Sequence, residues 1–360
     1  FVETTVCQRR GARWSTADAY LRPALKRSNL HLRTGATATR VLIEDGRAVG
    51  VEYEADGRRQ IIHARREVIL SAGAFHSPVI LQRSGIGPGE LLAQHGIHVR
   101  VDAPEVGANL QDHLQARLVF EASAPVSLNT LYHSPVRKAL AGLHWLLANG
   151  GPLAEPPIRA GGFLRSDDTV ARPDVQFHLG EFSNAGSGAP LDRFHGFMIT
   201  VCVLRPESRG HVHLRSPDPL ALPVIVKNYL SAASDCAATV RGVRLARRIA
   251  IHQPLAGLIR REVQPGVETT SDEALLDAAR ATASSVYHPV GTCRMGADAH
   301  SVLDPELRVR GVAGLRVADG SVMPRLVSGN TNAPIVMIGE RAADLVLNAW
   351  EALNKCSELT

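Results

Sequence analysis

The sequence has few aromatic residues, little lysine and no long apolar run. Phe, Tyr and Trp make up 4% of its 360 residues. The absence of an uninterrupted apolar stretch of about 18 residues argues against a membrane-spanning helix. The formal net charge is +5, but the arginines are dispersed and no nucleic-acid-binding motif is present. We therefore expect no nucleic-acid partner.

Cysteine is also sparse. The five cysteines are widely spaced, with neither a C-x-x-C pair nor the ligand spacing of a zinc site. This usage favours a reducing compartment, and we expect a protein of the cytoplasm, or one peripheral to the inner membrane. His211 and His213 place two imidazoles on one face of a strand, but no third ligand follows nearby, so we expect no metal site.

The N-terminus lacks the features of a targeting segment. The chain begins with Phe1, and no charged stretch followed by an apolar one is found there. We expect a fragment or a processed product. With 45% hydrophobic and 21% charged residues, the composition is that of a globular protein, and the length predicts about two domains.

Alternation of apolar and polar residues predicts a small antiparallel sheet from His31 to Ser71, with tight turns at Asp45-Gly46 and Asp56-Gly57. After its last strand, Ser77-Pro78 is typical of an N-cap followed by the first helical residue. Further helices are predicted at Val136–Ala148, Ala232–Ile251, Asp272–Ala283 and Pro334–Leu353, and further strands at Val175–Leu179, Phe197–Val203, His211–Leu214 and Leu315–Val317.

A dinucleotide site usually carries G-x-G-x-x-G between a strand and a helix, because glycines let the backbone approach the pyrophosphate. No good copy is present. The nearest string, Gly85-Ile86-Gly87-Pro88-Gly89-Glu90, has its third glycine one place early and follows a predicted helix. It indicates a helix end and a turn.

The stretch from Gly73 to Gly87, GAFHSPVILQRSGIG, resembles the second signature of the glucose-methanol-choline (GMC) flavin oxidoreductases, and every constrained position of that signature matches. Other stretches resemble the same family in the same order along the chain. They are VGANLQDHL (106–114), LRPESRG (204–210), NYL (228–230), VYHPVGTCRMG (286–296), VADGSVMP (317–324) and SGNTNAP (328–334).

The resemblance implies a fold of the α+β/α/β class. It implies an FAD-binding domain of the GMC type, incomplete at its N-terminus, and a substrate domain built on an antiparallel sheet flanked by helices. The implied boundaries are 1–116 for the C-terminal portion of the FAD-binding domain, 117–287 for the substrate-binding domain and 288–360 for the return to the FAD-binding domain. The C-terminal homology region spans about 204–345 of these residues. The family's glycine fingerprint is missing, so the chain is expected to be truncated.

The activity implied by the resemblance is FAD-dependent oxidation of the CH–OH group of an alcohol, by hydride transfer to flavin N5. The alcohol is expected to be a primary alcohol, choline-like or a polyol, and the electrons are expected to pass to a quinone or another acceptor. An oxidase that passes electrons to O₂ would use the same residues. The oligomeric state stays open.

Alcohol oxidation needs a base, because an alkoxide expels hydride far more readily than a neutral alcohol does. Histidine has a suitable pKa. His288 precedes Pro289, which favours an extended backbone, and the family match makes His288 the base. Asn332 occupies the family's second active-site position. It can donate and accept hydrogen bonds, so we assign it to the substrate oxygen. It is equally typical of an N-cap.

The cofactor residues implied by the resemblance lie near the C-terminus. Asn332, Ala333 and Pro334 open a helix whose N-terminus would stabilise negative charge at the pyrimidine end of the flavin. Asp319 and Gly320 are similar to a pair that contacts FAD, although Asp-Gly is also an ordinary turn. Ala38 matches a residue whose backbone contacts adenine in relatives.

Two other functions stay open at this point. Hydroxynitrile lyases share this scaffold and use the histidine for acid–base chemistry without flavin redox turnover. An inactive truncated fragment, unable to bind FAD, is the third interpretation.

Overall fold

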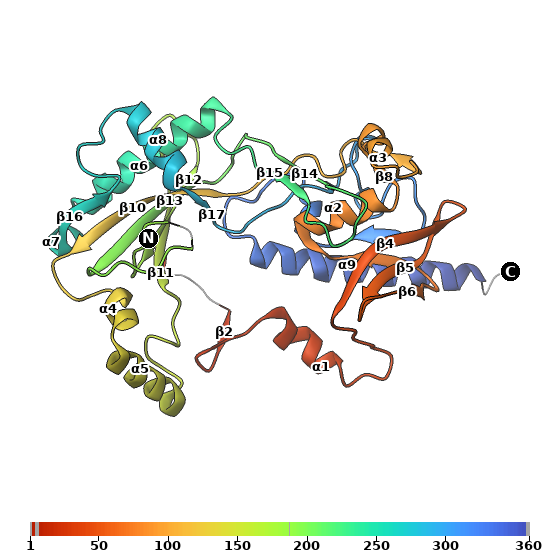
Figure 1. The fold of residues 1–360 in the computed structure, drawn as a ribbon, viewed down its shortest axis with the longest axis horizontal. Coiled ribbons are helices and arrows are strands. Elements are labelled where there is room, and N and C mark those ends of the chain that lie inside the picture. The colour runs from red at the N-terminus through yellow and green to blue at the C-terminus, as the bar shows by residue number, and fades with distance from the viewer. Residues whose placement is uncertain (1, 4–6, 187, 358–360) are drawn as a thin grey trace. The chain divides into compact units, whose positions relative to one another are not determined.

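The computed structural model describes residues 2–3, 7–186 and 188–357, and the chain divides into two compact units (Figure 1). Unit 1 comprises Phe1–His31, His113–Glu207 and Ala232–Val286. Unit 2 comprises Leu32–Asp112, Ser208–Ser231 and Tyr287–Thr360. The changes of unit at 112/113 and 286/287 lie near the predicted domain boundaries, but residues 1–31 and 208–231 are partitioned differently. The two units are defined by their contacts alone. The assignment of FAD-binding and substrate-binding roles to the predicted domains therefore stays a prediction.

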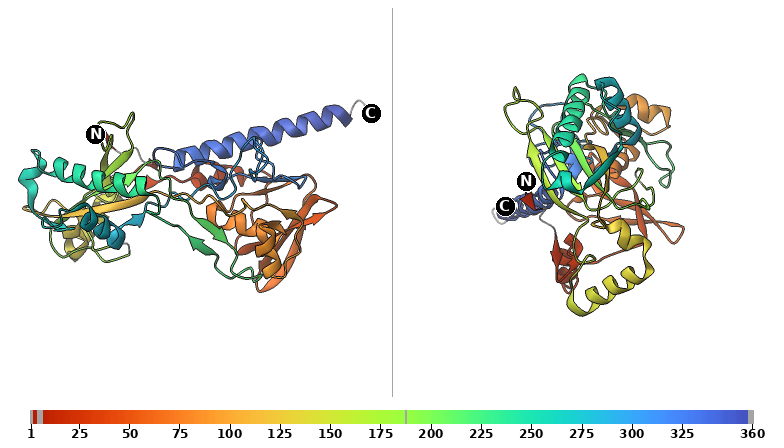
Figure 2. Two further views of the ribbon diagram at one scale, coloured as in Figure 1. Left: turned by 90° about the horizontal axis from the view of Figure 1, so that it is seen from above. Right: turned by 90° about the vertical axis from the view of Figure 1, so that its left-hand side faces the viewer.

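Unit 1 is built on one antiparallel sheet, in the order β1-β11-β12-β13-β10-β16, with β17 also paired to β10. Its helices α6 and α8 pack on β13 and β10 (Figure 2). The antiparallel sheet flanked by helices is therefore confirmed. These elements are β1 (Val2–Glu3), β10 (Leu114–Ala122), β11 (Ile158–Leu164), β12 (Val175–Gly180), β13 (Gly196–Val203), β16 (Ile259–Gln264), β17 (Ser284–Ser285), α6 (Ala233–Ala250) and α8 (Asp272–Thr282).

Successive side chains along each strand of this sheet point to opposite faces. Leu118, Phe177 and Ile199 come from three adjacent strands and are buried in one core cluster with Val243 of α6 and Leu275 of α8. The intervening residues point to the opposite face. Apolar residues on one face of the sheet thus account for the helices that cover it.

The remaining elements of unit 1 are short apart from one helix. A hairpin of two short strands precedes a π-helical turn and a single helical turn, and a helical pair follows β10. They are β2 (Gln8–Arg9), β3 (Ala12–Arg13), the turn Ala17–Leu21, α1 (Arg22–Ala24), α4 (Leu128–His133), α5 (Pro135–Ala148) and α7 (Leu255–Leu258).

Unit 2 contains the predicted three-stranded antiparallel sheet, formed by β4 (Ala36–Glu44), β5 (Arg47–Ala55) and β6 (Arg58–His63). Both hairpin turns are confirmed. Asp45 and Gly46 have φ values of 47° and 73°, and the second Asp-Gly pair repeats this pattern. Two successive left-handed residues are the geometry that a two-residue hairpin needs.

A parallel strand pair contributes residues to the hydrophobic core of unit 2. β7 (Val68–Leu70) pairs with β18 (Leu315–Val317), which is distant in sequence. The other elements are α2 (Gly73–Arg83), β8 (Ile86–Gly87), α3 (Gly89–Gln94), β9 (Val101–Asp102), β14 (His211–His213), β15 (Val224–Val226), the 3₁₀ turn Gly320–Val322 and α9 (Asn332–Ser357).

The predicted start of the helix after β7 is wrong. α2 begins at Gly73, with Ser77 and Pro78 inside it. The Ser77 hydroxyl accepts from the Ala72 N–H at 3.0 Å and donates to Asp319 at 2.5 Å. A distant carboxylate therefore fixes this serine, which local sequence could not reveal.

None of the helices within the described ranges is long and apolar enough to cross a membrane.

Candidate active site

His288 is held by a buried carboxylate that the sequence interpretation did not single out. The backbone N–H of His288 donates to Asp112 Oδ1 at 2.9 Å, and the Tyr229 hydroxyl donates to the other carboxylate oxygen, Oδ2. Asp112 and His288 are 6% and 8% exposed. A charge-assisted hydrogen bond inside the fold fixes the backbone at His288 more firmly than water-exposed contacts would.

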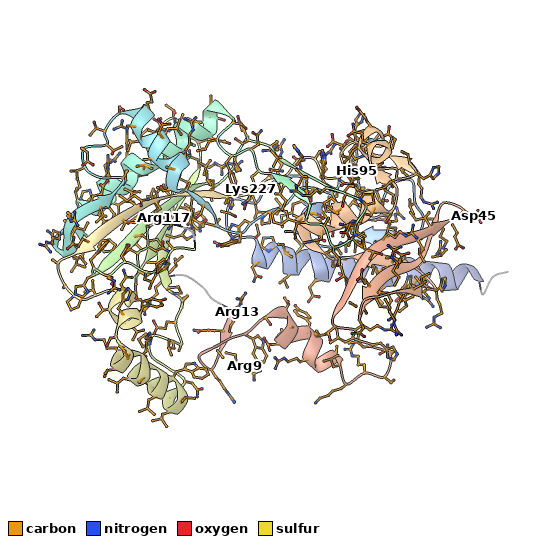
Figure 3. The ribbon with its side chains drawn as sticks, viewed as in Figure 1. Arg9, Arg13, Asp45, His95, Arg117 and Lys227 are labelled. Carbon is orange, nitrogen blue, oxygen red and sulfur yellow. The ribbon has the colours of Figure 1, made fainter. Side chains whose placement is uncertain are left out.

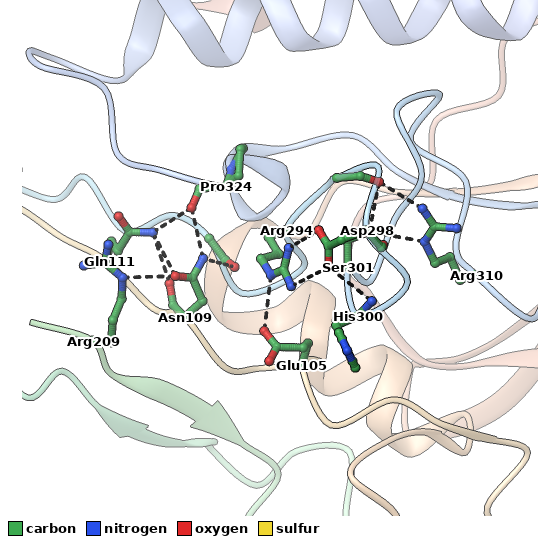
Figure 4. Close-up of polar contacts among 12 residues, drawn as sticks. Glu105, Asn109, Gln111, Arg209, Arg294, Asp298, His300, Ser301, Arg310 and Pro324 are labelled. Carbon is green, nitrogen blue, oxygen red and sulfur yellow. Dashed lines mark hydrogen bonds and ion pairs between the residues drawn. The ribbon is translucent and has the colours of Figure 1, made fainter. Parts of the chain in front are cut away.

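The segment that carries His288 is also tied to the loop before α9. Gln111 and Val290 exchange backbone hydrogen bonds of 3.0 and 2.9 Å. The Gln111 side-chain amide accepts from the Leu326 N–H and donates to the Pro324 carbonyl; Figure 4 shows the contact with Pro324. One buried glutamine thereby joins residues near positions 111, 290 and 325.

Close packing fixes the residues that follow His288. Gly291 has a φ of 97°, and a Cβ atom there would lie 2.5 Å from the Asn109 carbonyl oxygen. Thr292 is fully buried, and its hydroxyl donates to the Ala74 carbonyl at 2.6 Å. That carbonyl lacks its usual helical partner because Pro78, four residues on, has no N–H. Thr292 satisfies it instead.

Asp319 and Gly320 lie where these segments meet. The Asp319 carboxylate accepts from Gly73 N–H, Ser77 hydroxyl and Ser321 N–H, at 2.9, 2.5 and 2.8 Å. It therefore anchors the fold, and a cofactor contact at this pair would fall to backbone atoms. A Cβ atom on Gly320 would lie 3.5 Å from the Pro289 carbonyl oxygen and 3.2 Å from Ile335 Cδ1.

The packing at Gly320 brings two predicted site segments together. Pro289 directly follows His288, and Ile335 lies in the first turn of α9, which begins at Asn332. The prediction that Asn332 is the N-cap is wrong by one residue, since Asn332 is already helical; Thr331 accepts the N–H of Ile335 at 3.0 Å.

The start of α9 has the chemistry that an anionic group requires. Asn332 and Ala333 are exposed, and the first turn contains no acidic residue. The leading N–H groups of a helix have no intrahelical acceptor, and the helix dipole adds positive potential there. The small Ala333 side chain leaves room for close approach. The residues present at this helix start therefore fit an anionic portion of FAD.

Of the other sequence candidates, Ala38 packs against the core cluster that contains Val290 and Val322. Ala38 lies on β4, opposite Tyr53 of β5, and its predicted contact with adenine stays a prediction. The His211 and His213 rings lie with centroids 4.5 Å apart and planes tilted by 32°. Burial lowers the pKa of His213, with a smaller contribution from His211. Among the described residues, no group of three or more His, Cys, Asp or Glu side chains is placed to hold a metal ion.

A second polar network in Figure 4 stabilises the segment beyond Thr292. Arg294 forms ion pairs with Glu105 at 3.2 Å and with Asp298 at 2.9 Å, and hydrogen bonds from Arg294 lower the pKa of Asp298 to about 2. The adjacent Cys293 thiol is buried, which raises its pKa. These contacts hold the segment that begins at His288 in place on its C-terminal side.

Comparison with known proteins gives consistent matches. Profiles of the family described as GMC oxidoreductase match residues 2–115 and 206–339. An uncharacterised GMC-type oxidoreductase of Mycobacterium tuberculosis is 49% identical over 351 residues, covering 96% of this chain and 65% of the relative. An oxygen-dependent choline dehydrogenase of Rhizobium johnstonii is 45% identical over 339 residues, covering 94% of this chain and 61% of the relative.

A solved structure of formate oxidase from Aspergillus oryzae, studied for FAD modification, matches with a TM-score of 0.89 at 25% identity, covering 96% of this chain and 65% of that one. In each of these three comparisons, the chain spans less than two thirds of the other protein's length.

Proposed function

Since this chain belongs to the GMC oxidoreductase family, we propose that it takes part in FAD-dependent oxidation of the CH–OH group of an alcohol, with His288 as the general base. The expected alcohol is a primary alcohol, choline-like or a polyol. FAD is the family's cofactor, and when bound it accepts the hydride that leaves the alcohol carbon.

His288 takes the hydroxyl proton in this proposal. Removing that proton generates alkoxide character, which weakens the adjacent C–H bond toward hydride loss. General-base positioning typically contributes about 10² to 10⁴ in rate. The observation that carries the proposal is the attachment of the His288 backbone to buried Asp112, because a base contributes fully only when it is held in place.

Asn332 is assigned to hydrogen-bond the substrate oxygen, since a neutral amide can donate or accept but cannot act as a base near neutral pH. Ala333 and Pro334 open α9 beside it and would hold an anionic part of FAD. The packing of Gly320 against both Pro289 and Ile335 supports placing these roles in one site. Ala38 and the Asp319-Gly320 pair complete the proposed cofactor contacts.

The proposed electron acceptor is a quinone or another acceptor, and the proposed location is the cytoplasm or, as the alternative, the periphery of the inner membrane. Oxygen consumption and dye reduction, measured side by side with one alcohol, distinguish an oxidase from a dehydrogenase. A lyase that uses the same histidine would leave the flavin absorbance unchanged on mixing with alcohol.

The proposal is tested by His288→Ala in the FAD-loaded protein that contains this chain. Stopped-flow mixing with the alcohol should show flavin reduction slowed by about 10² or more, with the FAD content unchanged. His98→Ala, which removes an exposed histidine of the same unit, is the control. Reduction of the His288 variant at the wild-type rate would contradict the proposal.

A further inference from the structure

Helix α5 of unit 1 exposes an apolar stripe to solvent. Val136, Leu140, Leu143 and Leu147 follow the spacing that places side chains on one face of a helix, and they are 68%, 60%, 51% and 78% exposed. Leu146, next to the stripe, is 70% exposed. Apolar residues scattered singly over a surface need no explanation, but five on one short helix do.

The helix is formed and attached without using this stripe. Ser134 caps its N-terminus by accepting from the Arg137 N–H, Pro135 occupies the first turn, and Asn149 ends it in the left-handed conformation. Attachment comes from the other side, where Ala141 is buried and the Trp145 indole N–H donates to the Gly11 carbonyl at 2.8 Å. The exposed stripe is therefore not needed to hold α5 in place.

The surface of α5 outside the stripe and the hairpin that contacts it are positively charged. The Gly11 contact joins α5 to the β2–β3 hairpin, whose Arg9 and Arg13 are labelled in Figure 3. Lys138 Nζ, in the first turns of α5, lies 5.4 Å from the ring centre of Tyr132 near the end of α4. The cations of segments 7–14 and 128–149 are Arg9, Arg10, Arg13, Arg137 and Lys138, and neither segment contains Asp or Glu.

We propose that α5 and the β2–β3 hairpin form a docking surface for an anionic lipid bilayer. Leucines on one face of a helix, with basic residues on its remaining surface, are the features by which a helix lies in the membrane interface. A second copy of the chain fits less well, because it would cover the leucines and leave the cations of both segments without facing carboxylates. This inference names the surface that would produce the peripheral membrane attachment proposed above.

The test uses flotation of the 360-residue chain with lipid vesicles, so it requires neither FAD nor activity. The chain should float with phosphatidylcholine vesicles that contain about a third phosphatidylglycerol, should float poorly with pure phosphatidylcholine, and should be released by about 0.5 M NaCl. The double variant Leu140→Gln/Leu147→Gln should lower partitioning by about tenfold or more.

The matched control is Leu222→Gln/Ile251→Gln, which removes two apolar side chains of similar exposure (75% and 72%) outside the surface and should float like the wild type. Arg9→Gln/Arg13→Gln should lower binding to the anionic vesicles only, with folding of all variants checked by circular dichroism. Wild-type chain that stays with the soluble fraction, or equal losses in the control, would overturn the proposal. So would a dimer that dissociates in the leucine variant, measured by analytical ultracentrifugation.

Discussion

Different interactions hold the two units in their folded structures. In unit 1 a repeated alternation of apolar residues builds one large sheet, and its helices cover the apolar face. In unit 2 the segments around His288 contain little regular structure and are held by single polar side chains, among them Asp112, Gln111, Thr292 and Asp319. Many residues share the work of holding the sheet of unit 1, so one substitution there removes only part of the support. A segment held by a single buried hydrogen bond loses its support when that one side chain is replaced.

The first prediction tests the sheet core of unit 1. Phe177 is fully buried on β12, so Phe177→Ala should lower the free energy of unfolding by about 3 to 5 kcal/mol, measured by urea denaturation. Hydrogen exchange should accelerate in β12 and β13 and not in β4 and β5. Phe163→Ala, on the neighbouring strand at 42% exposure, should cost less than about 1 kcal/mol. Equal acceleration in both units would remove the distinction between them.

The second prediction concerns acid stability in unit 1. Burial lowers the pKa of His178 to about 4, with a smaller contribution from His113. The unfolded state, with a pKa of about 6.5, binds the proton more readily, so stability is lost as the pH falls from about 6.5 toward 4, by about 3 kcal/mol in total. His178→Gln should flatten this dependence in urea unfolding at several pH values, whereas substitution of exposed His31 should leave it unchanged. A persistent slope in the His178 variant would refute the assignment.

The third prediction concerns the buried carboxylate that supports His288 in unit 2. Asp112→Asn removes the negative charge and turns one acceptor oxygen into a donor, so the Tyr229 hydroxyl must accept where it now donates, and the bond to the His288 N–H loses its charge assistance. We expect a loss of about 1 to 3 kcal/mol and faster exchange of the His288 amide, measured by NMR. Tyr229→Phe keeps the His288 contact and should preserve that amide's protection. Unchanged exchange in the Asn variant would mean that Asp112 does not position His288.

The fourth prediction has the smallest expected effect. It compares a helix cap, made by a residue three positions away, with the contact of Asp112, made over a long sequence distance. The Ser271 hydroxyl accepts from the Ala274 N–H at the start of α8, and Ser271→Ala should cost about 1 kcal/mol by chemical denaturation. Thr270→Ala, one residue earlier and outside the cap, serves as the control. A cost as large as that of Asp112→Asn would show that local caps and distant carboxylates contribute alike.

Sequence patterns predicted much of the fold because their signals are local. The Asp45-Gly46 hairpin and the capped helix at Ser271 both depend on near neighbours. Ser77 failed as an N-cap because its partner, Asp319, lies 242 residues away.

The candidate site was predicted in part and for a different reason. His288 and Asn332 came from a family resemblance, and their roles stay predictions. Asp112 was missed, although it lies in the quoted stretch VGANLQDHL, because its function depends on a backbone amide 176 residues further on. Buried polar residues of this kind have no periodicity to reveal them. A run of closely spaced Asn, Gln and Asp within an apolar stretch is the one signal available.

The parallel pairing of β7 with β18 has a consequence for synthesis on the ribosome. Val68 meets Leu315 only after nearly the whole chain has been made, so the early part of unit 2 emerges long before its partner strand exists. Contacts so distant in sequence slow folding and leave apolar strand edges exposed meanwhile. The nascent chain should therefore depend on chaperone binding until translation passes residue 317, with the intervening sheet of unit 1 free to fold first.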